Sequence, residues 1–266
     1  MEKSNLKILT WNIDRNESDI EIRFPNLLKE IEELTPDIVC LQENIKNEKY
    51  NIANHLVSRY GYSLVSYNEN DSYVLVKDAK SHSSIFDLAT DKFLACGKIQ
   101  IKDREFMIGS AHLSWGTGKE SVRLNESLLI ENLFAKHTEL DPFRSKNDVI
   151  GILCGDLNTE PQSATLRYLT GLGVENGSST MWTDSWIKGN DAGITSSATN
   201  ILAGRTAKSV GLKGLNLPER RIDYILVRGF AYSRPGEFIA TKLVGNYNSE
   251  DKICSDHYWI LTTLSV

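Results

Sequence analysis

Short apolar runs recur along the chain and alternate with turn-forming residues, which is typical of β-strands joined by short connections. Several of these runs alternate apolar and polar positions with a period of two, so one face of each such strand is expected to be buried. We expect ten strands, over residues 6–13, 37–41, 62–67, 72–77, 93–101, 105–112, 148–154, 221–227, 237–244 and 258–264.

Apolar residues at helical spacing predict three helices between the strands. The first helix has Pro25 near its start, where a missing N–H costs little, and it ends before Pro36. The positions that define the helices are Phe24, Leu27, Leu28, Ile31 and Leu34 in the first, Leu124, Leu128, Leu133 and Phe134 in the second, and Leu166 and Leu169 in the third, which follows Pro161.

The number of strands relative to helices indicates the fold class. Ten strands with few helices are too many for a simple doubly wound sheet, so we expect an α/β fold with two mostly antiparallel sheets packed face to face and helices outside. No linker interrupts the pattern, and a single domain is expected to cover residues 1–266. Residues 174–220 are irregular, and a loop of that length is usually functional or a misread pair of short elements.

Composition limits the class of protein further. Hydrophobic residues make up 41% of the chain, enough for a sizeable core, and the net charge of −5 argues against a strongly basic nucleic-acid surface. The four cysteines form no CxxC pair, which favours buried free thiols in a reducing compartment. The sequence shows no signal peptide or membrane span, so we expect a cytoplasmic, monomeric protein without a membrane anchor.

Polar residues follow or open many of the predicted strands, and this is the most informative feature of the chain. A single residue of this kind is ordinarily a turn or a cap. Together, however, they form a set that the ends of neighbouring strands could bring to one place. The set consists of Asn12, Glu43, His112, Asp156, Asn158, Asp223, Asp256 and His257.

The chemistry of this set suits phosphoester hydrolysis. Carboxylate and amide oxygens are the ligands of hard cations such as Mg²⁺ or Mn²⁺. An imidazole beside a carboxylate acts as a base or as a phosphate-binding cation. These groups together indicate metal-assisted attack of water on a phosphoester.

Six motifs carry a resemblance to a known family. They appear in the family's order over residues 10–260 and resemble the endonuclease/exonuclease/phosphatase superfamily, with most similarity to its tyrosyl-DNA phosphodiesterase 2-like members. The GDLNTEP segment and residues 194–200 depart from the pattern of that branch. The resemblance implies a four-layer α/β-sandwich of the deoxyribonuclease I type. The motifs are TWNID (10–14), LQEN (41–44), SAHL (110–113), GDLNTEP (155–161), RIDYILV (221–227) and SDHYWI (255–260).

The resemblance also implies roles for the residues nearest a metal and the attacking water. Glu43 is expected to be the principal ligand of Mg²⁺, or of Mn²⁺, with Asn12 beside it. Asp256 is expected to help hold the metal or a neighbouring histidine. Asp156 would orient or deprotonate the water, and Asn158 would hold the phosphate.

Further roles follow from the same resemblance. Asp223 and His257 are expected to form a hydrogen-bonded carboxylate–imidazole pair, and His112 to bind a phosphoryl oxygen or assist the leaving group. The identity of the general base stays open. Substrate contacts are expected from residues outside the catalytic set: Trp115, Arg123, Thr195 and Asn200.

Three functions compete on this basis. The first is a divalent-metal-dependent phosphodiesterase acting on a nucleic acid or a 5′-phosphotyrosyl-DNA adduct, with a role in DNA repair. The second is a phosphoesterase for a small molecule such as a nucleotide, a sugar phosphate or a phospholipid headgroup. The third, a non-catalytic relic of the fold, predicts the loss of motif residues, yet all of them are present. A long basic groove would favour nucleic acid, and a closed pocket would favour small molecules.

Overall fold

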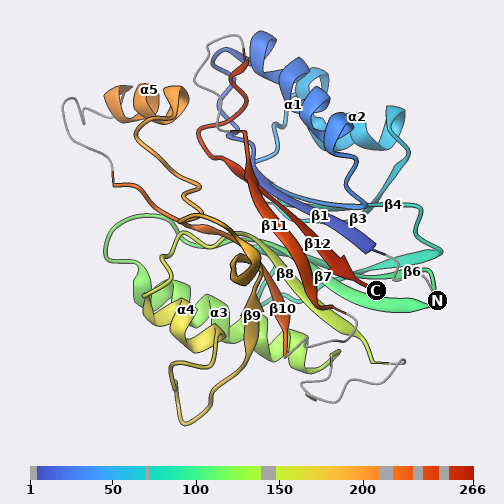
Figure 1. Cartoon of the computed structure of the whole chain (residues 1–266), viewed down its shortest axis with the longest axis vertical. Helices are drawn as coiled ribbons and strands as arrows, with labels where there is room; N and C mark the ends of the chain where they lie inside the picture. The colour runs from blue at the N-terminus through green and yellow to red at the C-terminus, as the bar shows by residue number, and fades with distance from the viewer. Residues whose placement is uncertain (1–4, 70–71, 139–147, 210–217, 230–235, 246–251) are drawn as a thin grey trace.

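Two six-stranded sheets pack face to face in the computed structural model (Figure 1), which describes residues 5–69, 72–138, 148–209, 218–229, 236–245 and 252–266. The first sheet has the order β11–β12–β1–β2–β4–β3, with β1 Asn5–Asn12, β2 Ile38–Gln42, β3 Tyr62–Tyr67, β4 Tyr73–Lys77, β11 Phe238–Val244 and β12 Trp259–Ser265. The second has the order β5–β6–β7–β8–β10–β9, with β5 Ser81–Ile85, β6 Leu94–Ile101, β7 Arg104–His112, β8 Ile150–Asp156, β9 Trp182–Asp184 and β10 Asp223–Arg228.

Helices cover the outer faces of both sheets and complete four layers (Figure 1). One apolar cluster fills the space between the sheets, and a separate cluster lies beneath each pair of covering helices. The predicted four-layer α/β-sandwich is therefore confirmed. The first sheet is covered by α1 (Ile20–Leu34) and α2 (Ile52–Arg59), the second by α3 (Glu120–Ala135) and α4 (Ala164–Leu169), and α5 (Ile201–Ser209) stands to one side (Figure 1).

Each sheet contains one parallel pair of strands near its centre, and the other described pairs are antiparallel. These pairs are β1–β2, with α1 between them in the chain, and β7–β8, with α3 between them. Both are therefore β–α–β units, whose strands end at the same edge of a sheet. Ligands of α/β proteins bind outside such carboxyl ends. This topology explains why polar residues that follow different strands can meet.

The elements differ from the sequence pattern in a few places. The pattern does not predict β5 because its sequence, SHSSI, is polar and lies exposed at the edge of a sheet. It also misses α2, and it misses β9 and α5 within the irregular stretch 174–220. The expectation that Pro25 lies near a helix start is wrong. Helix α1 begins at Ile20, so Pro25 lies inside it.

Two further observations concern the cysteines and the helices. All four cysteines are buried free thiols, as their apolar surroundings predict. None of the helices in the described part of the chain combines the length and the apolar character needed to cross a bilayer.

Candidate active site

One edge of the sandwich collects the polar residues that follow or open the central strands. In the strand register, Asp156 lies at the end of β8, opposite His112 of β7 on one side and Asp223 of β10 on the other. Asn12 ends β1, and Glu43 directly follows β2. The topology therefore brings to this edge the set predicted from the sequence: Asn12, Glu43, His112, Asp156, Asn158, Asp223, Asp256 and His257.

Asn12 connects the two sheets at this edge. Its Nδ2 donates to Glu43 Oε1 at 3.3 Å and to Asp156 Oδ2 at 3.1 Å. Glu43 has a left-handed backbone, with a φ of 54°, which ends the extended backbone of β2. Its other oxygen accepts from the backbone N–H of Arg15 at 3.3 Å and from Arg15 Nε at 3.2 Å.

The carboxylates at this edge repel one another, which is the situation a divalent cation relieves. Burial and the charge of Glu43 raise the pKa of Asp256, although His257 and a buried arginine oppose the shift. Burial raises the pKa of Asp14 to about 6, and the charge of Asp256 adds to the effect. The pKa of Glu43 is lowered, because the charges of His112 and Arg15 outweigh its burial. The donor set of Asn12, Glu43 and Asp256 thus fits a hard cation.

Asp14 and Arg15 were not singled out from the sequence, although Asp14 belongs to the TWNID motif and Arg15 follows it. A buried arginine, Arg23, holds their loop. Its guanidinium donates to the carbonyls of Ile13, at 2.6 Å, and Asp14, at 2.7 Å, and it also donates to Cys254 O at 2.8 Å. It therefore ties the loop after β1 to the segment before Asp256. The only signal for these residues is their place next to a strand end.

The predicted carboxylate–imidazole pair is present in the geometry. His257 Nδ1 lies 2.9 Å from Asp223 Oδ2, and its Nε2 lies 3.9 Å from Asp156 Oδ2. The pKa of His257 is raised well above its ordinary value, because Asp223 and Asp156 outweigh the opposing effect of burial. Burial, aided by Asp156, raises the pKa of Asp223. Ligand atoms of Asp156, Asp223 and His257 lie within 4.8 Å of one another, so these residues could also hold a metal ion.

His112 lies between Glu43 and Asp156, on the side of Asp156 opposite Asp223. Its Nε2 is 3.8 Å from Glu43 Oε1 and 3.7 Å from Asp156 Oδ2. If the extended backbone of β8 continued, Asn158 would point to the same side as Asp156, two residues earlier. Asn158 does not share that backbone, because β8 ends at Asp156. Instead it has a φ of 51°, its N–H donates to Asp156 Oδ1 at 2.9 Å, and its Nδ2 donates to Leu113 O at 3.1 Å.

Two of the residues expected to contact substrate lie behind the site. Thr195 is fully buried, and its Oγ1 accepts from the backbone N–H of Asp223 at 3.2 Å. Asn200 is also buried, and its Nδ2 donates to Ser255 O at 3.0 Å while its Oδ1 accepts from the N–H of Leu202 at the start of α5. Both side chains therefore support the segments that carry His257 and Asp223.

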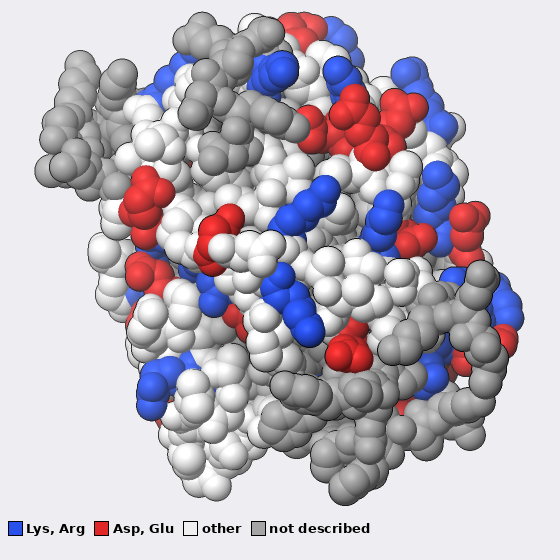
Figure 2. Space-filling model, in the orientation of Figure 1, with Lys and Arg blue, Asp and Glu red and all other residues white. Residues whose placement is uncertain are grey.

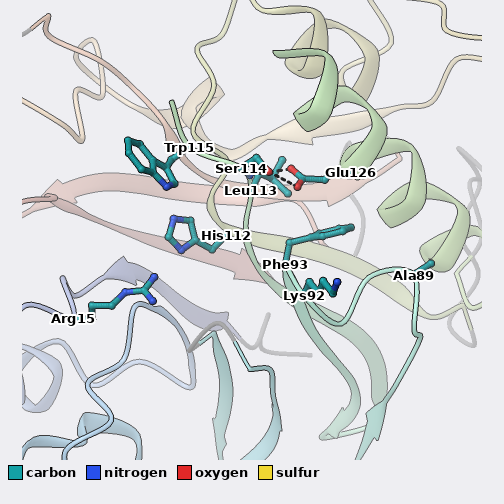
Figure 3. A pocket seen from close by; sticks show the side chains of 9 residues that line it. All are labelled: Arg15, Ala89, Lys92, Phe93, His112, Leu113, Ser114, Trp115 and Glu126. Atoms are coloured by element: carbon teal, nitrogen blue, oxygen red, sulfur yellow. Dashed lines mark hydrogen bonds between the residues drawn. The ribbon is translucent and has the colours of Figure 1, made fainter. Parts of the chain in front are cut away.

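The other two residues belong to the loop after β7. Trp115 is exposed, at 78% of its surface, whereas Arg123 is buried at 7% and donates to the loop carbonyls of Ser114 and Gly116 at 2.9 and 3.2 Å. Trp115 lines a cavity of about 510 Å³ that also includes His112 (Figure 3). The structure thus places one of the four expected contacts, Trp115, in a cavity beside the candidate catalytic residues.

The fold and the site together define a class: a two-sheet sandwich with carboxylate, amide and imidazole groups gathered at one edge. Comparisons with known proteins agree. The model of the Endonuclease/Exonuclease/phosphatase family matches residues 9–257. The chain belongs to this family, and it is therefore a hydrolase of the nuclease and phosphodiesterase type.

Individual relatives are distant in sequence. The structure is similar to that of D. rerio TDP2 complexed with a single-strand DNA product, with a TM-score of 0.71 and 19% identity, covering 99% of this chain and 100% of the other. It is also similar to the human Nocturnin catalytic domain with a bound sulfate anion, with a TM-score of 0.64 and 19% identity over 98% and 94% of the two chains. Protein angel of Drosophila melanogaster is 24% identical over 172 residues, which are 56% of this chain and 46% of that protein.

Proposed function

We propose that the protein is a divalent-metal-dependent phosphodiesterase whose substrate is a nucleic acid or a 5′-phosphotyrosyl-DNA adduct. The observation that carries the proposal is the surroundings of one carboxylate. Oδ2 of Asp156 accepts a hydrogen bond from Asn12 and lies within 4 Å of the imidazoles of His112 and His257. The similarity to a TDP2 bound to a single-strand DNA product supports the substrate class. Action on such adducts would make the enzyme part of DNA repair.

Glu43 and Asp256 would hold the metal, because their carboxylates repel one another, and Asn12, whose Nδ2 donates to Glu43 Oε1, would lie beside it. A bound Mg²⁺ or Mn²⁺ supplies charge neutralisation at the phosphate and a more acidic water. Asn12 also donates to Asp156, so the same side chain would fix the position of the water-orienting carboxylate relative to the metal ligands. In this proposal the metal ligands would belong to the first sheet and the water-orienting group to the second.

The second sheet and the segment before β12 supply the proton chemistry. Asp223 holds Nδ1 of His257, so Nε2 is left facing Asp156 across 3.9 Å. With its raised pKa, His257 is a cation that would stabilise the negative charge developing on the phosphate. His112 would contact a phosphoryl oxygen or the leaving group from the opposite side. Because His257 would already carry its proton, Asp156 is the group that would accept the proton of the attacking water.

The surface charge favours a locally bound substrate over a long duplex. Lys and Arg side chains are mixed with Asp and Glu over the face that Figure 2 shows, and the net charge is −5. Non-specific binding of a duplex depends on neutralising many phosphates with basic side chains. A single strand or the end of a strand needs fewer such contacts and can rely on the metal and a local patch.

A small-molecule phosphoester is the second candidate, and the cavity beside His112 favours it. Its volume of about 510 Å³ lies within the range of about 300–1,000 Å³ that is usual for small-molecule sites. Nucleotides, sugar phosphates and phospholipid headgroups all belong to this class. The choice between the two candidates depends on which esters the enzyme hydrolyses.

A hydrolysis panel with Mg²⁺ and with Mn²⁺ tests the proposal. The substrates are single-stranded DNA with a 5′-phosphotyrosyl end, abasic duplex DNA, plain DNA, RNA, bis-p-nitrophenyl phosphate and small phosphoesters, with Asp156→Ala as the control. We expect fastest turnover of a nucleic-acid substrate, and loss of that turnover in Asp156→Ala. Turnover of small phosphoesters alone would contradict the nucleic-acid proposal, and equal turnover by Asp156→Ala would contradict the site.

A further inference from the structure

The exposed side chain of Trp115 stands on a loop that is held firmly in place. Arg123 donates to the carbonyls of Ser114 and Gly116, which precede and follow the tryptophan. Glu126 accepts from the N–H of Ser114 at 2.9 Å and from its Oγ at 2.6 Å. A large aromatic group on a loop with this many fixed contacts loses little conformational entropy on binding. It is therefore suited to act as a rigid platform for a flat ligand.

The cavity next to Trp115 combines this platform with positive charge. Arg15, whose side chain is 50% exposed, and the exposed Lys92 lie on the wall opposite Trp115 (Figure 3). Phe93 also lines the cavity, next to Lys92, and His112 lies between Trp115 and Arg15 (Figure 3). The cavity thus offers an aromatic wall, the cationic side chains of Lys92 and of Arg15, which also pairs with Glu43, and access to His112. The carboxylate that lines it, Glu126, is bound to Ser114.

We propose that this cavity is a subsite for one unpaired nucleotide unit adjacent to the phosphate that is cleaved. The base stacks on Trp115, and the phosphate of the unit lies near Arg15 and Lys92. The inference rests on the proposed function and adds to it the form of the substrate. A base inside a duplex is stacked on its neighbours and could not reach Trp115, so the subsite selects a free nucleotide or a single strand.

A tyrosine side chain from a protein adduct is the competing occupant. It would also stack on Trp115, but it carries no phosphate of its own beyond the one that is cleaved. Two cationic side chains on the opposite wall are better used by a nucleotide, which brings an additional phosphate. A nucleotide would therefore use more of the side chains that line the cavity than a tyrosine would. Tighter binding of O-phosphotyrosine than of AMP is the result that would favour the tyrosine.

The test measures ligand binding by calorimetry in EDTA, so that neither turnover nor a divalent metal contributes. Under these conditions the carboxylates at the strand ends repel phosphate, and binding reports on the cavity. The ligands are AMP, adenosine, ribose 5-phosphate, O-phosphotyrosine and a 5′-phosphorylated tetranucleotide. We expect AMP to bind more tightly than the three other small ligands, because adenosine lacks the phosphate, ribose 5-phosphate lacks the base, and the single ring of O-phosphotyrosine covers less of Trp115 than a purine does.

Two variants and a matched control assign the contacts. Trp115→Leu should weaken AMP binding by about 5-fold or more, the loss expected for one stacked base. Lys92→Gln should weaken AMP by about 2- to 5-fold and leave adenosine unchanged, because an exposed charge contributes modestly. Trp186→Phe, which changes a tryptophan outside this cavity, should bind as the unaltered protein does. Both replaced residues of the cavity are exposed, so thermal unfolding should be unchanged.

Several results would overturn the subsite: no saturable binding of AMP, equal binding of adenosine and AMP, tighter binding of O-phosphotyrosine, or no effect of Trp115→Leu. If the tetranucleotide binds at least as tightly as AMP, the nucleotide unit comes from a strand, and if it binds more weakly, the unit is a free nucleotide. Because binding is measured without metal, the subsite can fail while Mg²⁺-dependent hydrolysis of bis-p-nitrophenyl phosphate persists. Conversely, AMP binding without any Mg²⁺-dependent hydrolysis would contradict the proposed function and leave the subsite in place.

Discussion

At the scale of single residues, Asp156 is the centre of the account. Its Oδ1 accepts from the N–H of Asn158, and its Oδ2 faces Asn12, His112 and His257. Only 2% of the residue is exposed. A carboxylate that is buried this far and still surrounded by hydrogen-bond donors and imidazoles is held in one orientation, which is what the alignment of an attacking water requires.

Replacement of Glu43 by Gln should weaken metal binding. The change removes the negative charge that attracts a divalent cation but keeps the size of the side chain and one acceptor oxygen. We expect the Mg²⁺ concentration for half-maximal hydrolysis to rise by about tenfold or more, because changes to the partners of metal ligands already cost about 10- to 100-fold in metal affinity. A Mg²⁺ titration of the initial rate measures this shift.

Glu48→Gln is the matched control, because Glu48 is an exposed residue of the short helix Glu48–Tyr50. Its half-maximal Mg²⁺ concentration should equal that of the unaltered protein. An unchanged Mg²⁺ dependence in Glu43→Gln would exclude Glu43 as the principal metal ligand.

At the scale of elements, Glu120 joins the first turn of α3 to that of α4. Its carboxylate accepts from the N–H of Thr165 at 2.8 Å, from Thr159 Oγ1 at 3.0 Å and from Arg123 Nε at 3.1 Å. Burial opposes ionisation, but these hydrogen bonds outweigh it and lower the pKa of Glu120. A lowered pKa in the folded state means that the ionised group stabilises the fold above its unfolded pKa, and that this contribution disappears as the pH falls through the folded value.

Glu120→Gln should therefore be less stable than the unaltered protein at pH 7, and the difference should shrink as the pH falls below about 4.5, near the usual pKa of glutamate. Urea unfolding between pH 3 and 7 measures the two free energies. A difference that stays constant over this range, or grows toward low pH, would contradict the assigned role of the carboxylate.

A buried ion pair fastens α3 to β10. Arg228 donates to Glu131 through Nη2 at 2.6 Å and through Nε at 3.2 Å, and Trp182 Nε1 donates to the same carboxylate at 2.8 Å. Arg228→Met leaves a buried carboxylate without its cation, so we expect a loss of about 3–5 kcal/mol in the free energy of unfolding. Adding Glu131→Leu to that variant should recover part of the loss, because no unpaired charge then remains. Additive losses in urea unfolding would show that the two side chains are not coupled.

The sequence predicts most of the strands but not the side-chain contacts made by the loops. All ten expected strands exist, because apolar runs mark the strands that are buried on both faces, such as β2 and β8, and period-two alternation marks strands with one buried face. Strand β5 is not predicted, because its side chains are mostly polar and exposed. The set of polar residues that meet at the sheet edge could be named from the sequence, because each member borders an apolar run; their catalytic roles stay a prediction. Arg123, Thr195 and Asn200 could be named from the family pattern, but only packing shows that their side chains face backbone groups and not the cavity. Contacts of this kind depend on loop conformation, which periodicity does not encode.

At the scale of the whole molecule, the site exists because two sheets end at one edge. Each sheet supplies a parallel pair whose strands stop there, and hydrogen bonds from Asn12 join Glu43 of the first sheet to Asp156 of the second. Among the buried residues between the sheets, Gln42 Nε2 of β2 donates to Ser110 Oγ of β7 at 2.9 Å and also joins the first sheet to the second. The proposed metal ligands and the proposed water-orienting group would therefore keep their separation only while the two sheets stay packed.

The measurement that tests this account most directly is the initial rate of phosphodiester hydrolysis after removal of metal by EDTA and after titration with Mg²⁺, for the unaltered protein and for Asp156→Ala. We predict no hydrolysis in EDTA, full recovery with Mg²⁺, and a rate in Asp156→Ala lower by about 10²-fold or more with unchanged thermal unfolding. Hydrolysis that survives thorough chelation, or a fully active Asp156→Ala, would contradict the central claim.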